Sequence, residues 1–338
     1  MSAVSSAVAG RSDAPLRIVF CAKESQSRVW LDALRSAFAG QGLAVDLWWR
    51  DAACTEVDAD AQQAEAALVW RPPAALFAEQ RALKLVFNLG AGVDALLAMP
   101  AFPRTAMLLR LEDAGMSEAL AEYVLAAVLR VYRGFDRYAI QQRAARWQPL
   151  PLRQRADFRV GVLGLGVIGS AIAGALAQHG FAVRGLARSP RAIEGVQSFA
   201  GAVDPRDVAC RAFLDQLDVL VAVLPLTDVT RGALNAALFA PLAPGAHLVN
   251  VGRGAQLNET DLLAALDGGQ LGGATLDVFA EEPLPQAHPF WARPEILVTP
   301  HVSAVTQLGP SVRQVAEKLA AWARGAAVDG VVDPLRGY

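Results

Sequence analysis

The sequence predicts an α/β protein with two doubly wound parallel sheets, one in each of two domains, and a cleft between the domains. Short apolar runs alternate with longer helical patterns along almost the whole chain, as in repeated βαβ units. The length of 338 residues gives room for two domains of about 150 residues each. A composition of 54% hydrophobic and 19% charged residues suffices for two buried cores.

The first series of apolar runs predicts a sheet of about five strands. An amphipathic helix at 27–40 lies between the first two runs and closes on a glycine, as helices often do. The expected strands are 17–23, 43–49, 66–72, 83–90 and 106–111.

A long helical pattern then separates the two series. From Ser117 to about Ala145, apolar residues recur at spacings of three and four, and Ser117 is a suitable N-cap. We expect one long helix at the boundary between the domains.

The second series predicts a six-stranded sheet, because its near-continuous apolar runs are typical of strands buried on both faces. A last helix at 312–324 is expected to return to the first domain. The predicted strands are 159–166, 181–187, 218–225, 247–254, 273–279 and 295–301. The expected bounds are a disordered lead-in at 1–14, a first domain at 15–113 and 303–338, and a second domain at 114–302.

Composition excludes several classes of function. The net charge of −2 with scattered arginines argues against nucleic-acid binding, which uses a basic face. Cys21, Cys54 and Cys210 form no CxxC pair, which predicts free thiols and no metal site. No apolar run reaches the roughly 18 residues of a membrane span, and the N-terminus lacks the apolar core of a signal peptide. We therefore expect a cytoplasmic protein.

A glycine-rich run, GVLGLGVIGSAIAG, follows a predicted strand and opens a helix. Gly164, Gly166 and Gly169 have the G-x-G-x-x-G spacing of dinucleotide-binding turns, with Val167 and Ile168 inside the loop. In this context the glycines allow a tight turn, close approach of a pyrophosphate and close helix packing. The alternative is an ordinary tight turn in an α/β sheet.

The position that usually selects NAD is occupied by alanine. An acidic residue about 20 positions after the glycines normally binds the ribose 2′-hydroxyl, whereas Ala187 stands 18 positions after Gly169. Arg188, Ser189 and Arg191 follow and offer charge-assisted hydrogen bonds to a 2′-phosphate. The sequence thus favours NADP over NAD, unless these arginines are only solvated surface charges.

Three ionisable residues follow strands of the second series, where ligands of open α/β sheets bind. They are Arg253, Glu282 and His301. Arginine suits planar recognition of a carboxylate, histidine gives or takes a proton near neutral pH, and a carboxylate partner orients the ring and favours its protonated form. Each residue alone has an ordinary structural explanation. Together they are the groups needed to reduce a 2-oxo acid by hydride transfer.

The chain resembles the D-isomer-specific 2-hydroxyacid dehydrogenase family from about residue 16 onward. The matching motifs are GVLGLGVIGSAIA, LPLT, LVNVGRGAQLNETDLLAALDGGQLGGATLDVFAEEPLP and VTPHVSA. Within the family, LRLEDAGMSEALAEYVL, RWQPLP, GVQSFAG and the terminal RGY resemble the NADPH-preferring glyoxylate/hydroxypyruvate reductase A branch.

The resemblance implies a flavodoxin-like substrate domain, an NADP-binding Rossmann domain and a role for each matched residue. Arg253 would bind the substrate carboxylate and polarise the keto oxygen, His301 would donate a proton to that oxygen, and Glu282 would pair with His301. In the loop NLGAGVD, backbone N–H groups of Ala91, Gly92 and Val93 would bind the carboxylate, although the same loop is explained by a simple strand-to-helix turn. The cofactor would also contact Leu224, Pro225, Val251, Gly252, Arg253, Asp277 and His301.

The resemblance further implies NADPH as the preferred cofactor, with NAD possible, and a homodimer joined by the cofactor domains. Trp147 matches a tryptophan of the dimer-forming arm, although a core or interface position explains it equally well. Trp48 and Trp49 would line the cleft or pack in the first core. Two other functions stay open: a reductase of a bulkier 2-oxo acid, such as a D-lactate dehydrogenase-like or phosphoglycerate dehydrogenase-like enzyme, and a non-catalytic dinucleotide-sensing binding protein.

Overall fold

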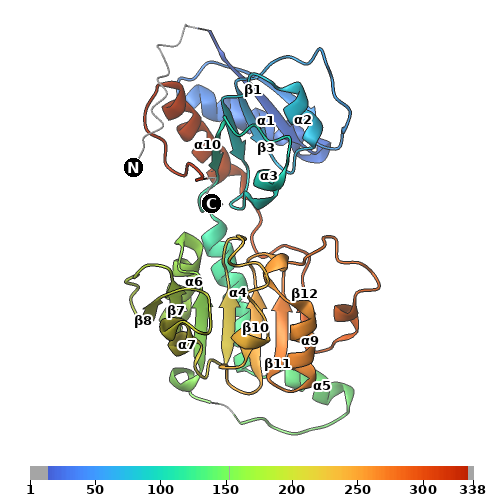
Figure 1. The fold of residues 1–338 in the computed structure, drawn as a ribbon, viewed down its shortest axis with the longest axis vertical. Helices are drawn as coiled ribbons and strands as arrows, with labels where there is room; N and C mark the ends of the chain where they lie inside the picture. The colour runs from blue at the N-terminus through green and yellow to red at the C-terminus, as the bar shows by residue number, and fades with distance from the viewer. Residues whose placement is uncertain (1–13, 152, 334–338) are drawn as a thin grey trace. The chain divides into compact units, whose positions relative to one another are not determined.

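The computed structural model describes residues 14–151 and 153–333, and these form two compact α/β units (Figure 1). One unit contains the described residues up to Gly115 together with those from Thr306 onward, and the other spans Met116–Val305. The lead-in expected at 1–14 lies outside the described residues apart from Ala14, and so does the terminal RGY motif.

The first unit is built on one parallel sheet with the strand order β2-β1-β3-β4-β5, which is the flavodoxin-like doubly wound order. The strands that cross its core are fully buried, as expected when helices cover both faces of a sheet. Helix α10 packs against α1, although the two are far apart in sequence. The bounds are β1 Leu16–Ala22, α1 Glu24–Gly40, β2 Val45–Asp51, β3 Ala66–Val69, α2 Ala74–Glu79, β4 Leu85–Asn88, α3 Asp94–Ala98, β5 Met107–Arg110 and α10 Leu308–Ala323.

The second unit is built on a parallel sheet with the order β12-β11-β10-β9-β6-β7-β8. This is the Rossmann order, extended by a strand at one edge. The predicted fold class, two doubly wound parallel-sheet units, is confirmed. The bounds are α4 Met116–Tyr132, α5 Phe135–Arg143, β6 Arg159–Leu163, α6 Val167–Gln178, β7 Ala182–Ala187, β8 Val196–Ala200, α7 Val208–Leu214, β9 Val219–Ala222, α8 Ala236–Phe239, β10 Ala246–Asn250, α9 Glu259–Asp267, β11 Leu271–Leu276 and β12 Ile296–Val298.

The strand count of this sheet differs from the prediction. Among the described residues the sheet has seven strands, whereas six were predicted. The additional strand, β8, lies at the sheet edge beside β7. Its sequence, VQSFA, has no apolar run and its residues are only partly buried or exposed. An edge strand of this kind lacks the hydrophobic signal that marks central strands.

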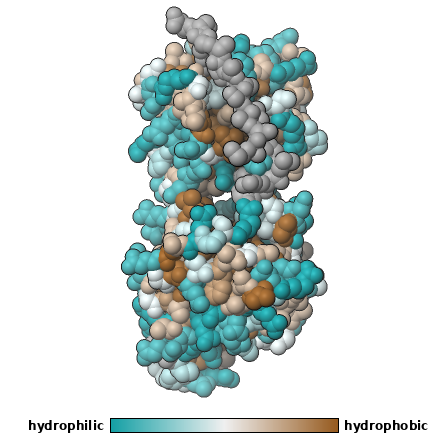
Figure 2. Space-filling model, turned by 60° about the vertical axis from the view of Figure 1, so that its left-hand side comes forward, coloured by the Kyte–Doolittle hydropathy of each residue, from teal (hydrophilic) through white to brown (hydrophobic). Residues whose placement is uncertain are grey.

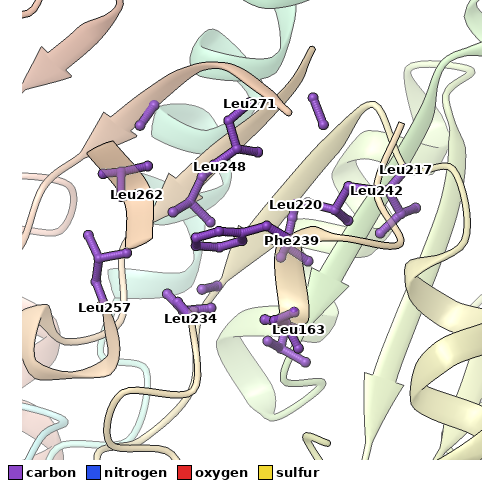
Figure 3. Packing of buried hydrophobic residues seen from close by; sticks show 14 of the residues in the cluster. Leu163, Leu217, Leu220, Leu234, Phe239, Leu242, Leu248, Leu257, Leu262 and Leu271 are labelled. Carbon is purple, nitrogen blue, oxygen red and sulfur yellow. The ribbon is translucent and has the colours of Figure 1, made fainter. Parts of the chain in front are cut away.

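Apolar residues cover both faces of the second sheet. Strand residues alternate along β9, with Leu220 in one cluster with α7, α8 and α9, and Val219 and Val221 in another with α4 and α6. Figure 3 shows the ring of Phe239 among leucines of the first cluster, including Leu248 of β10. This two-sided packing fixes the carboxyl ends of the strands, where the predicted site residues lie.

The predicted boundary helix is two helices. The pattern from Ser117 to Ala145 divides into α4 and α5 at Gly134, whose φ of 68° is left-handed. Glycine adopts this conformation without the steric cost that a side chain brings. Helix α4 buries one face in the second core, whereas α5 has no buried residue. The single long helix predicted here is therefore wrong.

No helix within the described part of the chain is both long and apolar enough to cross a membrane. On the face drawn in Figure 2, hydrophobic residues form small separated groups among hydrophilic ones.

Candidate active site

The glycine-rich run forms a tight turn between β6 and α6. Gly164 has a left-handed φ of 105°, and a side chain at Gly169 would overlap the carbonyl oxygen of Gly164. The first and third glycines are therefore required by the turn and by the close packing of the helix on it.

Gly166 is different, because a Cβ atom built there would meet no protein atom within 4 Å. It is the N-cap of α6, and the first N–H groups of a helix have no partner within the helix. The space beside Gly166 thus exposes backbone donors and the positive end of the helix dipole to an anion. These features fit the pyrophosphate of a dinucleotide.

Strand β7 ends at Ala187, whose carbonyl accepts a hydrogen bond from the N–H of Gly201 at 2.9 Å. The side chains of Arg188, Ser189 and Arg191 that follow are exposed. The segment from Ala187 to Arg191 thus carries a methyl group and two cationic side chains, and it contains no acidic residue.

Gln256, a buried residue that the sequence interpretation missed, joins the loops after β9 and β10. Its amide nitrogen donates to the carbonyls of Leu224 and Pro225, both at 3.0 Å, and its oxygen accepts from the N–H of Arg253 at 3.0 Å. Gly252 lies against it, because a Cβ there would meet Gln256 Oε1 at 2.6 Å. Among the polar residues around it in the sequence, nothing distinguishes Gln256 before the fold is known.

Arg253 follows β10 in extended backbone and is partly buried. The buried side chain of Asn250, which was also missed from the sequence, hydrogen-bonds to the backbone of this turn at two points. Its Oδ1 accepts from the N–H of Gly252 at 3.1 Å, and its Nδ2 donates to the carbonyl of Arg253 at 3.2 Å. Arg253 Nη1 donates to the carbonyl of Gly252 at 2.8 Å. The guanidinium is thus carried on a backbone fixed by buried groups.

His301 and Glu282 are in direct contact. His301 Nδ1 lies 2.8 Å from Glu282 Oε2, and Glu282 Oε1 accepts from the N–H of Phe279 at 3.1 Å. The two side chains are 38% and 24% exposed. The other ring nitrogen, Nε2, has no hydrogen-bond partner in the described part of the chain, so this nitrogen is open to a ligand.

Asp277 supports the segment that carries His301. The residue is fully buried, and its carbonyl accepts from the N–H of His301 at 2.9 Å. Its carboxylate accepts from the N–H groups of Val302 and Ser303, both at 2.9 Å. His301 has a φ of 56°, which is uncommon for a residue with a side chain. The buried carboxylate thus holds the backbone just beyond the histidine.

The second unit therefore brings most predicted site residues to one edge of one sheet. Arg253, Glu282 and His301 follow β10, β11 and β12, which are neighbours. The glycine loop follows β6, and Leu224 follows β9, the strand between β6 and β10. The carboxyl ends of parallel strands share one edge, so these loops line a common surface.

In the first unit, side chains donate hydrogen bonds to the backbone carbonyls of the loop after β4. Asn88 Nδ2 donates to the carbonyls of Gly90 at 2.9 Å and Gly92 at 2.7 Å, and Arg110 Nη1 donates to that of Ala91 at 2.9 Å. Within residues 14–151 and 153–333, the N–H groups of 91–93 donate to no protein group. This arrangement leaves the N–H groups of Ala91, Gly92 and Val93 for an anion. Asn88 and Arg110 were not predicted.

The three tryptophans singled out from the sequence have different surroundings. Trp49 donates from Nε1 to the carbonyl of Ala22 at 2.9 Å, and Trp48 is partly buried against the first core. Trp147 is 98% exposed in the single chain and so is not a core residue. In the part of the chain that the structure describes, no group of three or more His, Cys, Asp or Glu side chains is placed to hold a metal ion.

Comparisons with known proteins identify a family of similar chains. Residues 125–303 match the family model of the D-isomer specific 2-hydroxyacid dehydrogenase, NAD binding domain. A glyoxylate/hydroxypyruvate reductase A from Serratia proteamaculans is 50% identical over 284 residues, which cover 82% of this chain and 89% of that protein.

Solved structures show the same similarity. A D-isomer specific 2-hydroxyacid dehydrogenase from Xanthobacter autotrophicus Py2, solved with NADPH and MES, is 42% identical with a TM-score of 0.87, covering 96% of this chain and 100% of that one. An NADPH-dependent glyoxylate/hydroxypyruvate reductase from Sinorhizobium meliloti, solved with NADP and sulfate, is 34% identical with a TM-score of 0.83 at the same coverage. The resemblance identified in the sequence is confirmed.

Proposed function

This chain belongs to the D-isomer specific 2-hydroxyacid dehydrogenase family, in its glyoxylate/hydroxypyruvate reductase A-like branch, and on that premise we propose that it reduces glyoxylate to glycolate and hydroxypyruvate to D-glycerate with NADPH. The observation that carries the proposal is the contact between His301 and Glu282 in a dinucleotide-binding unit. These residues follow β12 and β11, the two strands that come next in the sheet to β10, the strand that Arg253 follows.

NADP is the cofactor, and the turn after β6 fits it. The open side of Gly166 receives the pyrophosphate, and the 2′-phosphate meets the cationic end of β7, where Ala187 removes the acidic residue that NAD-dependent relatives use. NADPH preference over NADH follows from these charges. The residues proposed to hold the cofactor are Gly164, Gly166, Val167, Ile168, Gly169, Ala187, Arg188, Ser189, Arg191, Leu224, Pro225, Val251, Gly252, Arg253, Asp277 and His301.

His301 acts as the proton donor. When bound, NADPH supplies the hydride that C2 of the 2-oxo acid accepts. His301 Nε2 then gives its proton to the keto oxygen, which becomes the hydroxyl of the product. Glu282 accepts the Nδ1–H hydrogen bond, and so orients the ring and leaves Nε2 as the nitrogen that carries the transferred proton.

Arg253 binds the substrate carboxylate and polarises the keto oxygen. Its planar guanidinium offers paired donors that match a carboxylate. The buried Asn250 and Gln256 side chains hold its backbone, so the cation is positioned before substrate binds. Fixed donors of this kind cost little reorganisation during the reaction.

The loop after β4 supplies further donors to the carboxylate. Backbone N–H groups of Ala91, Gly92 and Val93 bind it, since successive amides in a turn form a concave anion site. Asn88 and Arg110 keep the carbonyls of this loop turned away from the anion.

We further propose a cytoplasmic homodimer. Helix α5 has no buried residue, and its Phe135 and Ile140 are 57% and 47% exposed, close in sequence to the exposed Trp147. Apolar side chains gathered on one segment are typical of a protein–protein contact. Cys21, Cys54 and Cys210 are free thiols, as expected in a reducing compartment.

The proposal is tested by a panel of 2-oxo acids assayed in parallel with NADPH and NADH. We expect the highest kcat/KM for glyoxylate or hydroxypyruvate with NADPH. A higher value for pyruvate or a bulkier acid would overturn the assigned substrates. Binding of NADPH without oxidation by any acid of the panel would instead identify a dinucleotide-sensing protein.

A further inference from the structure

A chain of hydroxyl groups connects helix α4 to the segment that carries His301. The hydroxyl of Tyr123 lies 2.6 Å from Thr299 Oγ1, and Thr299 Oγ1 donates to Asp277 Oδ1 at 2.6 Å. Tyr123 and Thr299 are partly buried, and Asp277 is fully buried. The three residues come from α4, from the segment after β12 and from the segment after β11, so the bonds join parts that are distant in sequence.

The chemistry of these groups fixes the direction of both bonds. A carboxylate only accepts, so the single hydroxyl proton of Thr299 is directed to Asp277. Thr299 must then accept from Tyr123. Burial raises the pKa of Tyr123, which keeps this hydroxyl protonated as a donor. The result is a one-way sequence of hydrogen bonds that ends on Asp277 Oδ1.

The Asp277 carboxylate also holds the backbone next to His301. The same Oδ1 accepts from the N–H of Val302, and Oδ2 accepts from that of Ser303. Thr299 precedes His301 by two residues, so bonds to one carboxylate hold the chain on both sides of a residue with left-handed backbone. Such conformations persist where the surrounding contacts enforce them.

We propose that Tyr123 and Thr299 are positioning residues for proton transfer, which anchor the Asp277 carboxylate so that the His301 ring stays aligned with Glu282. This inference rests on the proposed function, in which His301 donates the proton. Neither side chain touches a reacting atom in this account. Both act through the backbone around His301.

The test uses Tyr123→Phe, which removes one hydroxyl, and Thr299→Val, which removes the central one while keeping its shape. Thr299→Ser restores the hydroxyl. Tyr132→Phe is the matched control, because the Tyr132 hydroxyl donates to the carbonyl of Arg153 at 2.8 Å, away from this segment. For each variant, kcat and KM for glyoxylate with NADPH are measured, together with the melting temperature and the Nδ1–H signal of His301.

We expect kcat to fall about 10-fold in Thr299→Val and about 3-fold in Tyr123→Phe, since small misalignments of reacting groups slow a reaction by up to roughly 100-fold. KM should change by less than about 2-fold, because substrate-binding groups are untouched. The Nδ1–H signal of His301 should shift in Thr299→Val, because its hydrogen bond to Glu282 changes when the backbone that carries the ring moves. Thr299→Ser and Tyr132→Phe should match the wild type.

Unchanged kcat in both Tyr123→Phe and Thr299→Val would overturn the inference. So would a lower melting temperature with an unchanged Nδ1–H signal of His301, since that would be a purely structural effect. Nuclear magnetic resonance of the His301 ring gives a readout that needs no turnover. If the wild type reduces no 2-oxo acid, the proposed function fails, and an Nδ1–H signal of His301 that is identical in Thr299→Val and wild type would then overturn the positioning role as well.

Discussion

His301 and Glu282 form a pair in which each partner is already constrained. Nδ1 of the histidine lies 2.8 Å from Oε2 of the glutamate, and the other glutamate oxygen is held by the N–H of Phe279. Because Nδ1 is engaged, Nε2 is the nitrogen that can meet a substrate. The pair therefore supplies a proton donor with a defined tautomer and direction.

Replacing Glu282 by glutamine should lower kcat about 10- to 100-fold, within the range for general acid catalysis. The amide can present its NH2 group to Nδ1 and so no longer holds the ring in one orientation. Initial rates with glyoxylate and NADPH measure this loss. Glu281→Gln is the control, because Glu281 is the neighbouring exposed carboxylate. If Glu282→Gln had the same kcat as this control, Glu282 would not be the partner that orients His301.

Replacing Arg253 by methionine should reduce kcat/KM for glyoxylate by about 100-fold or more, as for loss of a charged, pre-positioned donor. Arg253→Lys keeps the charge but not the planar pair of donors. Its kcat/KM for glyoxylate should lie between those of the wild type and the methionine variant. Steady-state kinetics check this order, with Arg211→Met, an exposed arginine on α7, as control. Equal activity of the lysine variant and the wild type would argue against paired contact with the carboxylate.

The double variant Arg188→Ala with Arg191→Ala should lower kcat/KM for NADPH about 100-fold or more, because two hydrogen bonds to a charged phosphate are lost and each is worth about 1.5–3 kcal/mol. NADH lacks that phosphate, so its kcat/KM serves as the internal control and should change little. Adding Ala187→Asp should raise the preference for NADH further by repelling the 2′-phosphate. A parallel loss with both cofactors would mean that these arginines are structural.

Asn88→Ala should raise KM for glyoxylate about 10-fold, because it frees two carbonyls of the loop that we assign to the carboxylate, at about 0.5–1.5 kcal/mol for each lost hydrogen bond. The dissociation constant of NADPH should stay the same, since Asn88 lies in the other unit. Asn235→Ala, which removes the N-cap of α8, controls for a general loss of stability. Weaker NADPH binding in Asn88→Ala would indicate a wider disturbance than a local change of the loop.

His247 should make the protein sensitive to acid. Burial, and secondly Arg130, lower the pKa of His247 to about 3, whereas an unfolded chain has a histidine pKa of about 6.5. Between these values the unfolded chain binds a proton that the folded chain does not. The free energy of unfolding should therefore fall below pH of about 6.5, by at most about 1.4 kcal/mol per pH unit, and this loss should be complete near pH 3.

Urea unfolding at several pH values measures how the free energy of unfolding changes with pH. His247→Gln should make this change smaller below pH of about 6.5. His179→Gln, at an exposed histidine, should leave it unchanged. Identical slopes for the wild type and His247→Gln would mean that other groups cause the acid sensitivity.

The sequence was most informative where the signal is local. Hydrophobic runs and glycine spacing predicted the two sheets, and the count from Gly169 to Ala187 placed the residue that ends β7. The predicted runs extend past several strand ends, as at 247–254, where β10 stops at Asn250. The backbone leaves the sheet there because the residues after it form the turn that presents Arg253.

The residues missed from the sequence share a physical cause. Gln256, Asn250 and Asn88 use polar side chains to hold loop carbonyls and N–H groups, and Tyr123 bonds to Thr299 across 176 positions of sequence. Which loops these side chains meet depends on the order of strands in the sheet. Periodicity and spacing carry no information on such pairings, so only the folded structure reveals them.

The most direct test of the account compares wild type and His301→Gln for oxidation of NADPH by glyoxylate, with NADPH binding measured on the same samples. If His301 donates the proton, the wild type should form glycolate in step with NADPH oxidation. His301→Gln should still bind NADPH but turn over at least about 100-fold more slowly. Equal turnover by the two proteins, or no oxidation of NADPH by the wild type, would contradict this expectation.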